Sequence, residues 1–246
     1  FLARPVEPVA ARQVGAGLSV VLVAGIAVSL VTLPPQNQPH TDVEGIAFGE
    51  PLAAPAGWHL VEQRNFPWVR RIYGRDADLI RQRFVADVGK LQWDKLARPR
   101  TVVVDATTTF RPVSLESYPE TVMYEQPSAR RSDPVSIELG HGVNGSLTTI
   151  VDDKRLLTYN VLTWVWRDEG SAQRVMIATV DNHDDDDVFP EPNGGLVATL
   201  RTMFSVFFRG NQAVWDSDPV FKDFDLLRDF GRGLVDAQFA RSGLRS

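Results

Sequence analysis

Between residues 135 and 180 the chain contains four runs rich in β-branched and aromatic residues: VSIEL (135–139), SLTTIV (146–151), LLTYNVLTWVW (156–166) and QRVMIATV (173–180). This composition is typical of β-strands, and turns rich in Gly or Asp separate the runs. Because the connections are short, neighbouring runs are expected to pair in an antiparallel sheet. The third run carries large residues at odd and even positions alike, which predicts a central strand covered on both faces.

Further elements are predicted on both sides of this segment. Upstream, TVVVDATTTF (101–110) has the composition of another strand. Residues 76–88 carry apolar residues at helical spacing, which predicts an amphipathic helix there. Downstream, apolar stripes predict helices over 195–209 and 222–241. The expected fold class is therefore α+β: an antiparallel β-sheet packed with two C-terminal helices and one preceding helix.

Residues 14–33, VGAGLSVVLVAGIAVSLVTL, form an uncharged apolar run of the length that a helix needs to cross a bilayer. Arg4 and Arg12 precede this run, and the next basic residue is Arg64, so the N-terminus is expected in the cytoplasm. A secretory signal peptide is the alternative, but its apolar core is typically only about 7–15 residues. The expected organisation is a cytoplasmic flank (1–13), a transmembrane helix (14–33), an extended stalk (34–57) and an extracytoplasmic α+β domain (58–246).

Composition narrows the class of protein. The chain has no cysteine, which excludes disulfides, cysteine-zinc sites and thiol nucleophiles. Its net charge of −5 argues against a nucleic-acid partner. Its 26 basic residues include only four lysines, Lys90, Lys95, Lys154 and Lys222, a bias that commonly accompanies a GC-rich genome and favours a bacterial source.

Residues 140–145, GHGVNG, match the GxGxxG pattern of dinucleotide-binding turns. In that motif the last glycine opens a helix whose N-terminal N–H groups hold the pyrophosphate. Here the run SLTTIV follows instead, so a glycine-rich hairpin turn is expected.

The acidic run DNHDDDD (181–187) offers carboxylate oxygens of the kind that bind calcium, with Asp181, His183 and Asp185 as candidate metal ligands. An EF-hand is excluded, because its sixth and twelfth positions would be Asp186 and Pro192 instead of Gly and Glu. A solvated acidic turn is favoured, and no metal or other cofactor is predicted.

Two surfaces are predicted to contact partners. The prolines that follow the acidic run, Pro190 and Pro192, suggest an ordered loop, with Asp184, Asp186 and Phe189 available to a partner. Within the apolar run, Gly15 and Ser19, and again Gly25 and Ser29, stand four residues apart, a spacing that lets another helix approach closely. The expected partners are integral membrane protein subunits and the lipid bilayer.

No catalytic residue is predicted. The four histidines, His40, His59, His141 and His183, do not form an HExxH motif, and no GxSxG motif marks a nucleophile.

The leading hypothesis is a non-catalytic accessory or assembly subunit of a bacterial cell-envelope complex, of transporter or respiratory type. A second hypothesis is a protein that binds a lipid or cell-wall intermediate near Trp164 and Trp166. A third is an envelope hydrolase, which requires a Ser or a carboxylate within hydrogen-bond reach of His141 or His183.

Overall fold

Among the residues that the structure describes, nine strands form the central sheet of the domain. This computed structural model describes residues 40–48, 50–118, 123–124, 129–152, 156–181, 189–194 and 223–244. Its strands are β1 (His40–Asp42), β2 (Trp58–Asn65), β3 (Asp78–Ala86), β4 (Thr101–Thr109), β5 (Ala129–Arg131), β6 (Val135–Gly140), β7 (Val143–Asp152), β8 (Leu157–Asp168) and β9 (Ser171–Val180). Its helices are η1 (Pro67–Val69), α2 (Arg70–Tyr73), α3 (Pro112–Ser117) and α5 (Phe224–Arg241).

The sheet is antiparallel except at one pair. Its strands follow the order β2-β3-β4-β9-β8-β7-β5, with β6 on β7 and with β1 parallel to β8. The four runs between residues 135 and 180 form β6 to β9, and the run at 101–110 forms β4, so these strand predictions are confirmed. A large antiparallel sheet with few helices is therefore the architecture of the domain.

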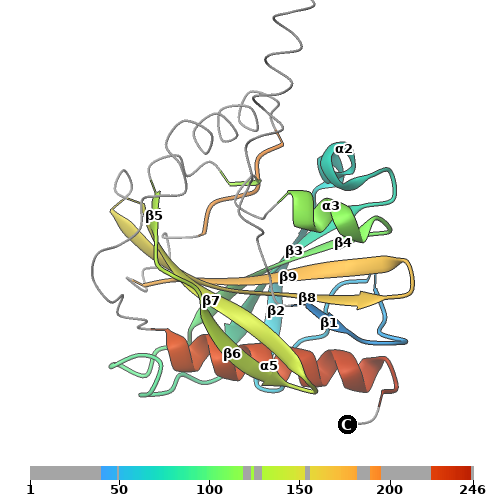
Figure 1. Ribbon diagram of the computed structural model, residues 1–246. Helices are drawn as coiled ribbons and strands as arrows, with labels where there is room; N and C mark the ends of the chain where they lie inside the picture. The colour runs from blue at the N-terminus through green and yellow to red at the C-terminus, as the bar shows by residue number, and fades with distance from the viewer. Residues whose placement is uncertain are drawn as a thin grey trace, which may run out of the picture. The chain divides into compact units, whose positions relative to one another are not determined.

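Helix α5 covers one face of this sheet (Figure 1). Leu162, Trp164 and Trp166 of β8 point to that face and are fully buried with the apolar side of α5. The alternate residues of β8, such as Tyr159 and Val161, belong to a second core on the opposite face, beneath η1, α2 and α3. Burial on both sides explains why β8 carries large residues on both of its faces.

The glycine-rich segment at 140–145 contains the turn of the β6–β7 hairpin, as predicted, and the turn itself is formed by His141 and Gly142. His141 and Gly142 occupy the left-handed region, with φ of +50° and +74°. Such values suit a tight turn and differ from those of a helix N-terminus.

The predicted helix over 76–88 is wrong, because this segment forms strand β3. Two polar residues in its middle are buried and hide the alternation of a strand. Arg81 pairs with Asp105, and the Gln82 side chain bonds both backbone groups of Leu52, at 2.8 and 3.0 Å. Only these tertiary contacts make buried polar side chains tolerable inside a sheet.

The predicted stalk also differs from the structure over its described part. Strand β1 pairs with β8, and Val43, Ile46 and Leu52 are buried in the core that α5 covers. Backbone groups of Ala47 bond side chains of α5 and of Ser242 just beyond it. The segment therefore belongs to the folded domain.

Helix α5 confirms the last predicted helix, and its Gly231 allows close packing, since a Cβ there would lie 3.1 Å from both Leu139 and Leu162. The predicted helix over 195–209 and the predicted transmembrane helix over 14–33 lie outside the described residues. Among the helices that the structure describes, none combines the length and the hydropathy needed to cross a bilayer.

The packing of the core beneath α5 can be tested with two matched leucine-to-alanine substitutions. Leu162→Ala should lower the free energy of unfolding by about 2–5 kcal/mol, because it leaves a cavity at a fully buried site. Leu91→Ala removes the same atoms from a side chain that is 75% exposed and should change stability by less than about 0.5 kcal/mol. Urea unfolding followed by circular dichroism measures both. Equal effects would contradict this packing.

Candidate functional site

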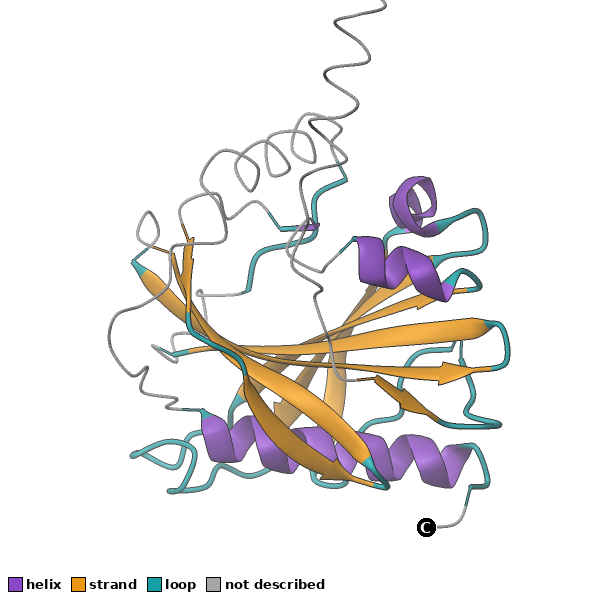
Figure 2. Cartoon of the chain, viewed as in Figure 1, coloured by secondary structure: helices purple, strands orange, loops and turns teal. Residues whose placement is uncertain are grey.

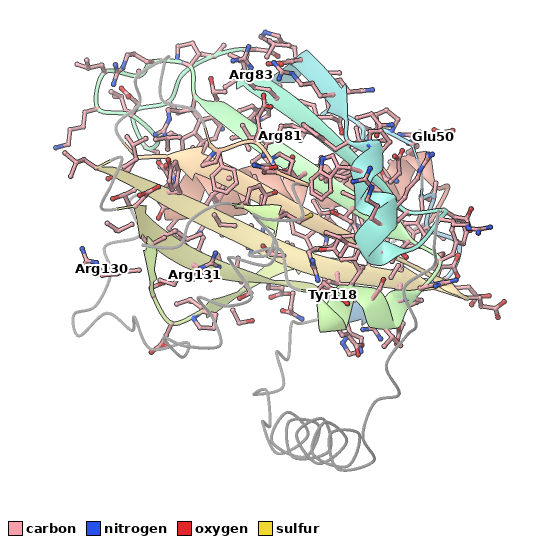
Figure 3. The ribbon with its side chains drawn as sticks, turned by 90° about the horizontal axis from the view of Figure 1, so that it is seen from above. Glu50, Arg81, Arg83, Tyr118, Arg130 and Arg131 are labelled. Atoms are coloured by element: carbon pink, nitrogen blue, oxygen red, sulfur yellow. The ribbon has the colours of Figure 1, made fainter. Side chains whose placement is uncertain are left out.

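A buried ionic cluster lies on the sheet face opposite α5, and Figure 3 labels Arg81 on β3, the strand next to the edge strand β2. Arg81 of β3 stands directly across from Asp105 of β4. Its Nε donates to Asp105 Oδ1 and its Nη2 to Oδ2, both at 2.7 Å. The Tyr124 hydroxyl donates to the same Oδ2. Arg81, Asp105 and Tyr124 are called the Arg81 cluster below.

The cluster holds a segment that crosses this face, residues 189–194, which we call the strap. Arg81 donates to the carbonyl oxygens of Phe189 and Pro190, at 3.3 and 2.9 Å. Farther along, Asn193 N–H donates to the carbonyl oxygen of Met123 at 2.8 Å. At Gly194 a Cβ would lie 2.2 Å from the Trp68 ring, so only glycine fits there.

Phe189 begins the strap and is only 2% exposed. Its ring packs edge-on against Tyr124 and Tyr159, with centroid distances of 5.0 and 5.2 Å. The Arg81 guanidinium lies 5.9 Å from the ring centroid. Phe189, which was predicted to be available to a partner, is therefore a core residue of this face.

Burial and charge set the protonation states of the cluster. Burial raises the pKa of the Tyr124 hydroxyl well above 10, and the negative charge of Asp105 raises it further. Burial alone would lower the pKa of Arg81, but the hydrogen bonds and charge of Asp105 outweigh it and raise that pKa above its ordinary value. Arg81 is thus charged and Tyr124 neutral at physiological pH.

These contacts make the residues of the Arg81 cluster poorly suited to act as nucleophiles or as general bases. The two Asp105 oxygens already accept three hydrogen bonds, two from Arg81 and one from Tyr124. A carboxylate that is buried and hydrogen-bonded in this way is a poor nucleophile or general base, and a tyrosine with a raised pKa does not act as a base at neutral pH. The arrangement is suited to holding the strap on the sheet.

A second buried guanidinium, Arg174 of β9, serves the same face. Its Nη1 donates to the carbonyl oxygen of Tyr118 at 3.1 Å and lies 3.5 Å from the Tyr73 hydroxyl. Its Nη2 donates to the carbonyl oxygen of Leu115. Arg174 therefore ties α3 and the residue that follows it to the sheet; Tyr118 is labelled beside α3 in Figure 3.

Most of the predicted site residues lie outside the described residues. Asp181 follows β9, is partly buried, and its N–H donates to the carbonyl oxygen of Thr158 at 2.9 Å. Outside the described residues lie the candidate ligands His183 and Asp185 and the predicted contact residues Gly15, Ser19, Gly25, Ser29, Asp184 and Asp186. Within the described ranges, no group of three or more His, Cys, Asp and Glu side chains is placed to hold a metal ion.

The structure also places residues on which the two alternative functions, lipid or cell-wall binding and hydrolysis, depend. Trp164 and Trp166 are fully buried and contact each other edge-on at 5.7 Å, so they are core residues in this structure. His141 Nε2 lies 2.9 Å from Asp236 Oδ1, which meets the carboxylate condition set for a hydrolase. The His141 ring also stacks on Phe239 at 4.2 Å, and both contacts join the β6–β7 turn to α5.

The Arg81 cluster was not predicted from sequence, although one signal was present. Asp105 is a single carboxylate within a run of β-branched residues, and a buried charge needs a partner. The partner could not be named, because Arg81 lies in a segment whose apolar spacing resembles a helix.

The ionic role of the cluster can be tested by Asp105→Asn. This change leaves the buried Arg81 guanidinium without a counter-charge and should cost about 3–5 kcal/mol of unfolding free energy. As a control, Glu62→Gln removes a carboxylate from the exposed pairs with Arg64 and Arg83 and should cost less than about 1 kcal/mol. Similar losses in both variants, measured by urea unfolding, would contradict the assignment.

The raised pKa of Tyr124 has a pH signature. Its contribution to stability is complete below the unfolded-state pKa of 10.0 and is lost as the pH rises above that value, because ionisation favours the unfolded chain. Tyr124→Phe should therefore remove up to about 1.4 kcal/mol per pH unit from the alkaline slope. Parallel slopes for the two proteins above pH 10 would show that Tyr124 is not the group responsible.

Comparisons with protein-family models, curated proteins and solved structures give no match to this chain.

Proposed function

We propose that this chain is a non-catalytic accessory subunit of a bacterial cell-envelope complex, of transporter or respiratory type. Residues 14–33 anchor it as a single membrane-spanning helix, and the sheet domain docks on the extracytoplasmic side. The uncharged length of the anchor and the position of Arg4 and Arg12 before it support this arrangement.

The observation that carries the proposal is the exposure of strand β2. In the described sheet β2 is the terminal strand, with β3 as its one strand neighbour. Leu60 and Val61 are each 43% exposed, and most of the other β2 side chains are also exposed. An edge strand presents backbone N–H and C=O groups with which an extended segment of a partner can pair, and apolar side chains add affinity.

Strand β2 also carries charged side chains and a local irregularity. Arg64 of β2 forms ion pairs with Glu62 and with Glu191 of the strap. The pairing register of β2 shifts between Leu60 and Glu62. Charges and a local irregularity of this kind discourage two identical edges from pairing, so a different subunit is the favoured occupant.

The hydrogen bonds and protonation states of the Arg81 cluster support the proposal that the chain is non-catalytic. Arg81, Asp105 and Tyr124 bond one another and the strap, and the raised pKa of Tyr124 keeps its proton in place. The alternatives have less support. Trp164 and Trp166 present no surface to a lipid or cell-wall intermediate, and the contacts of His141 are those of a residue that joins a turn to a helix.

Site-specific photocrosslinking in cells tests this function. A photoreactive benzoylphenylalanine in place of Leu60 should form an adduct with a second polypeptide, which also copurifies with the detergent-solubilised chain. The same replacement at Val113, which is 69% exposed on α3, is the matched control and should give no such adduct.

Two outcomes would contradict the proposal. One is migration of the solubilised chain as a lone monomer without an adduct at position 60. The other is protection of the domain when protease is added to intact spheroplasts, since an extracytoplasmic domain should be digested.

A further inference from the structure

The β3–β4 loop, residues 87–100, exposes three aliphatic side chains close together in sequence. Val88, Leu91 and Leu96 are 72%, 75% and 74% exposed. Figure 2 shows the loop beyond the sheet, next to the end at which α5 begins. Arg100, the last residue of the loop, confirms this position, because it donates two hydrogen bonds to Asp223 immediately before α5, both at 2.9 Å.

The exposure is a property of an ordered loop. The Trp93 side chain is buried, and the backbone carbonyl oxygen of Trp93 accepts a hydrogen bond from Arg100 at 2.8 Å. Asp94 is buried and accepts a hydrogen bond from the N–H of Leu96 at 2.7 Å. At Gly89 a Cβ would lie 1.9 Å from a backbone oxygen across the loop. The backbone is therefore held so that the aliphatic side chains point into solvent.

The charges around these side chains are mainly positive on the outside. Between residues 87 and 98 there are three basic residues (Lys90, Lys95, Arg98) and two acidic ones (Asp87, Asp94), a net charge of +3 − 2 = +1 within a chain of −5. Both acidic side chains have cationic or imidazole partners: Asp94 lies 2.9 Å from Arg98, and Asp87 lies 2.6 Å from His59.

The two lysines belong to the outer surface of the loop. Lys90 and Lys95 are both exposed, and they are two of the four lysines in the chain. The Lys90 ammonium lies 4.1 Å from the centre of the Trp93 ring, so its aliphatic stem runs along the loop surface. The loop thus combines exposed aliphatic side chains with exposed cationic ones.

We infer that this loop binds the interfacial layer of an anionic lipid bilayer, with Val88, Leu91 and Leu96 entering the headgroup region and Lys90 and Lys95 contacting lipid phosphates. Aliphatic insertion adds to electrostatic attraction in such binding, and each lysine near an anionic surface contributes. The positive loop on an acidic domain gives the charge complementarity. This contact is separate from docking through β2 and adds a second membrane contact to the proposed anchor.

The absence of cysteine makes the test direct, because a single introduced cysteine carries the only label. The full chain with Leu91→Cys, labelled with a polarity-sensitive fluorophore, is reconstituted into vesicles of phosphatidylcholine and phosphatidylglycerol. The emission should shift to the blue and be quenched by nitroxide-labelled lipid. The control is Val113→Cys, because Val113 is similarly exposed but lies beyond the opposite end of β4. Its label should remain in water.

Charge reversal tests the electrostatic part. Lys90→Glu and Lys95→Glu should each reduce the ratio of lipid-bound to free loop at least about fivefold, and omission of phosphatidylglycerol should reduce it as well. Equal quenching at positions 91 and 113 would overturn the inference. So would a blue shift at position 91 without lipid quenching, which would assign the loop to a second copy of the chain. Because these vesicles hold no other protein, the result is independent of crosslinking at Leu60.

Discussion

A guanidinium buried on a sheet face must keep its charge compensated and its N–H groups bonded, and the contacts of Arg81 on the face opposite α5 meet this requirement. Asp105, directly across on the next strand, supplies the counter-charge. The strap supplies carbonyl oxygens, and Tyr124 completes the hydrogen bonds of the carboxylate. One cross-strand ion pair therefore binds both the strap and Tyr124 on this face.

The same kind of bond joins the other face to its helix. Arg100, just before β4, makes a two-pronged contact with Asp223, just before α5, and both side chains are buried. The two pairs connect residues that are 24 and 123 positions apart in the chain. In a chain without cysteine, such buried pairs and the apolar core perform the joining that disulfides provide in many secreted domains. Their geometry also makes the fold specific, because a mispaired strand would leave a buried charge without its partner.

The outside of the domain carries two exposed surfaces that differ in composition, strand β2 and the β3–β4 loop. Strand β2 has an exposed edge that carries both apolar and charged side chains, which suits an extended protein segment. The β3–β4 loop has aliphatic tips and lysines, which suits lipid headgroups. Strand β3, which carries Arg81, pairs with β2 and leads into the β3–β4 loop, so it is connected to both proposed contacts.

Sequence alone determined the antiparallel strands from 135 to 180, the strand at 101–110, the hairpin turn at 140–145 and helix α5, because local composition and periodicity encode these elements directly. Tertiary structure alone decided that residues 78–86 form a strand, since Arg81 and Gln82 can be buried only where Asp105 and Leu52 receive them. It also decided that Phe189 is a core residue and that the segment after His40 belongs to the domain. Each of these facts depends on partners distant in sequence, and the spacing of residues along a chain carries no information about which distant group will complete a hydrogen bond.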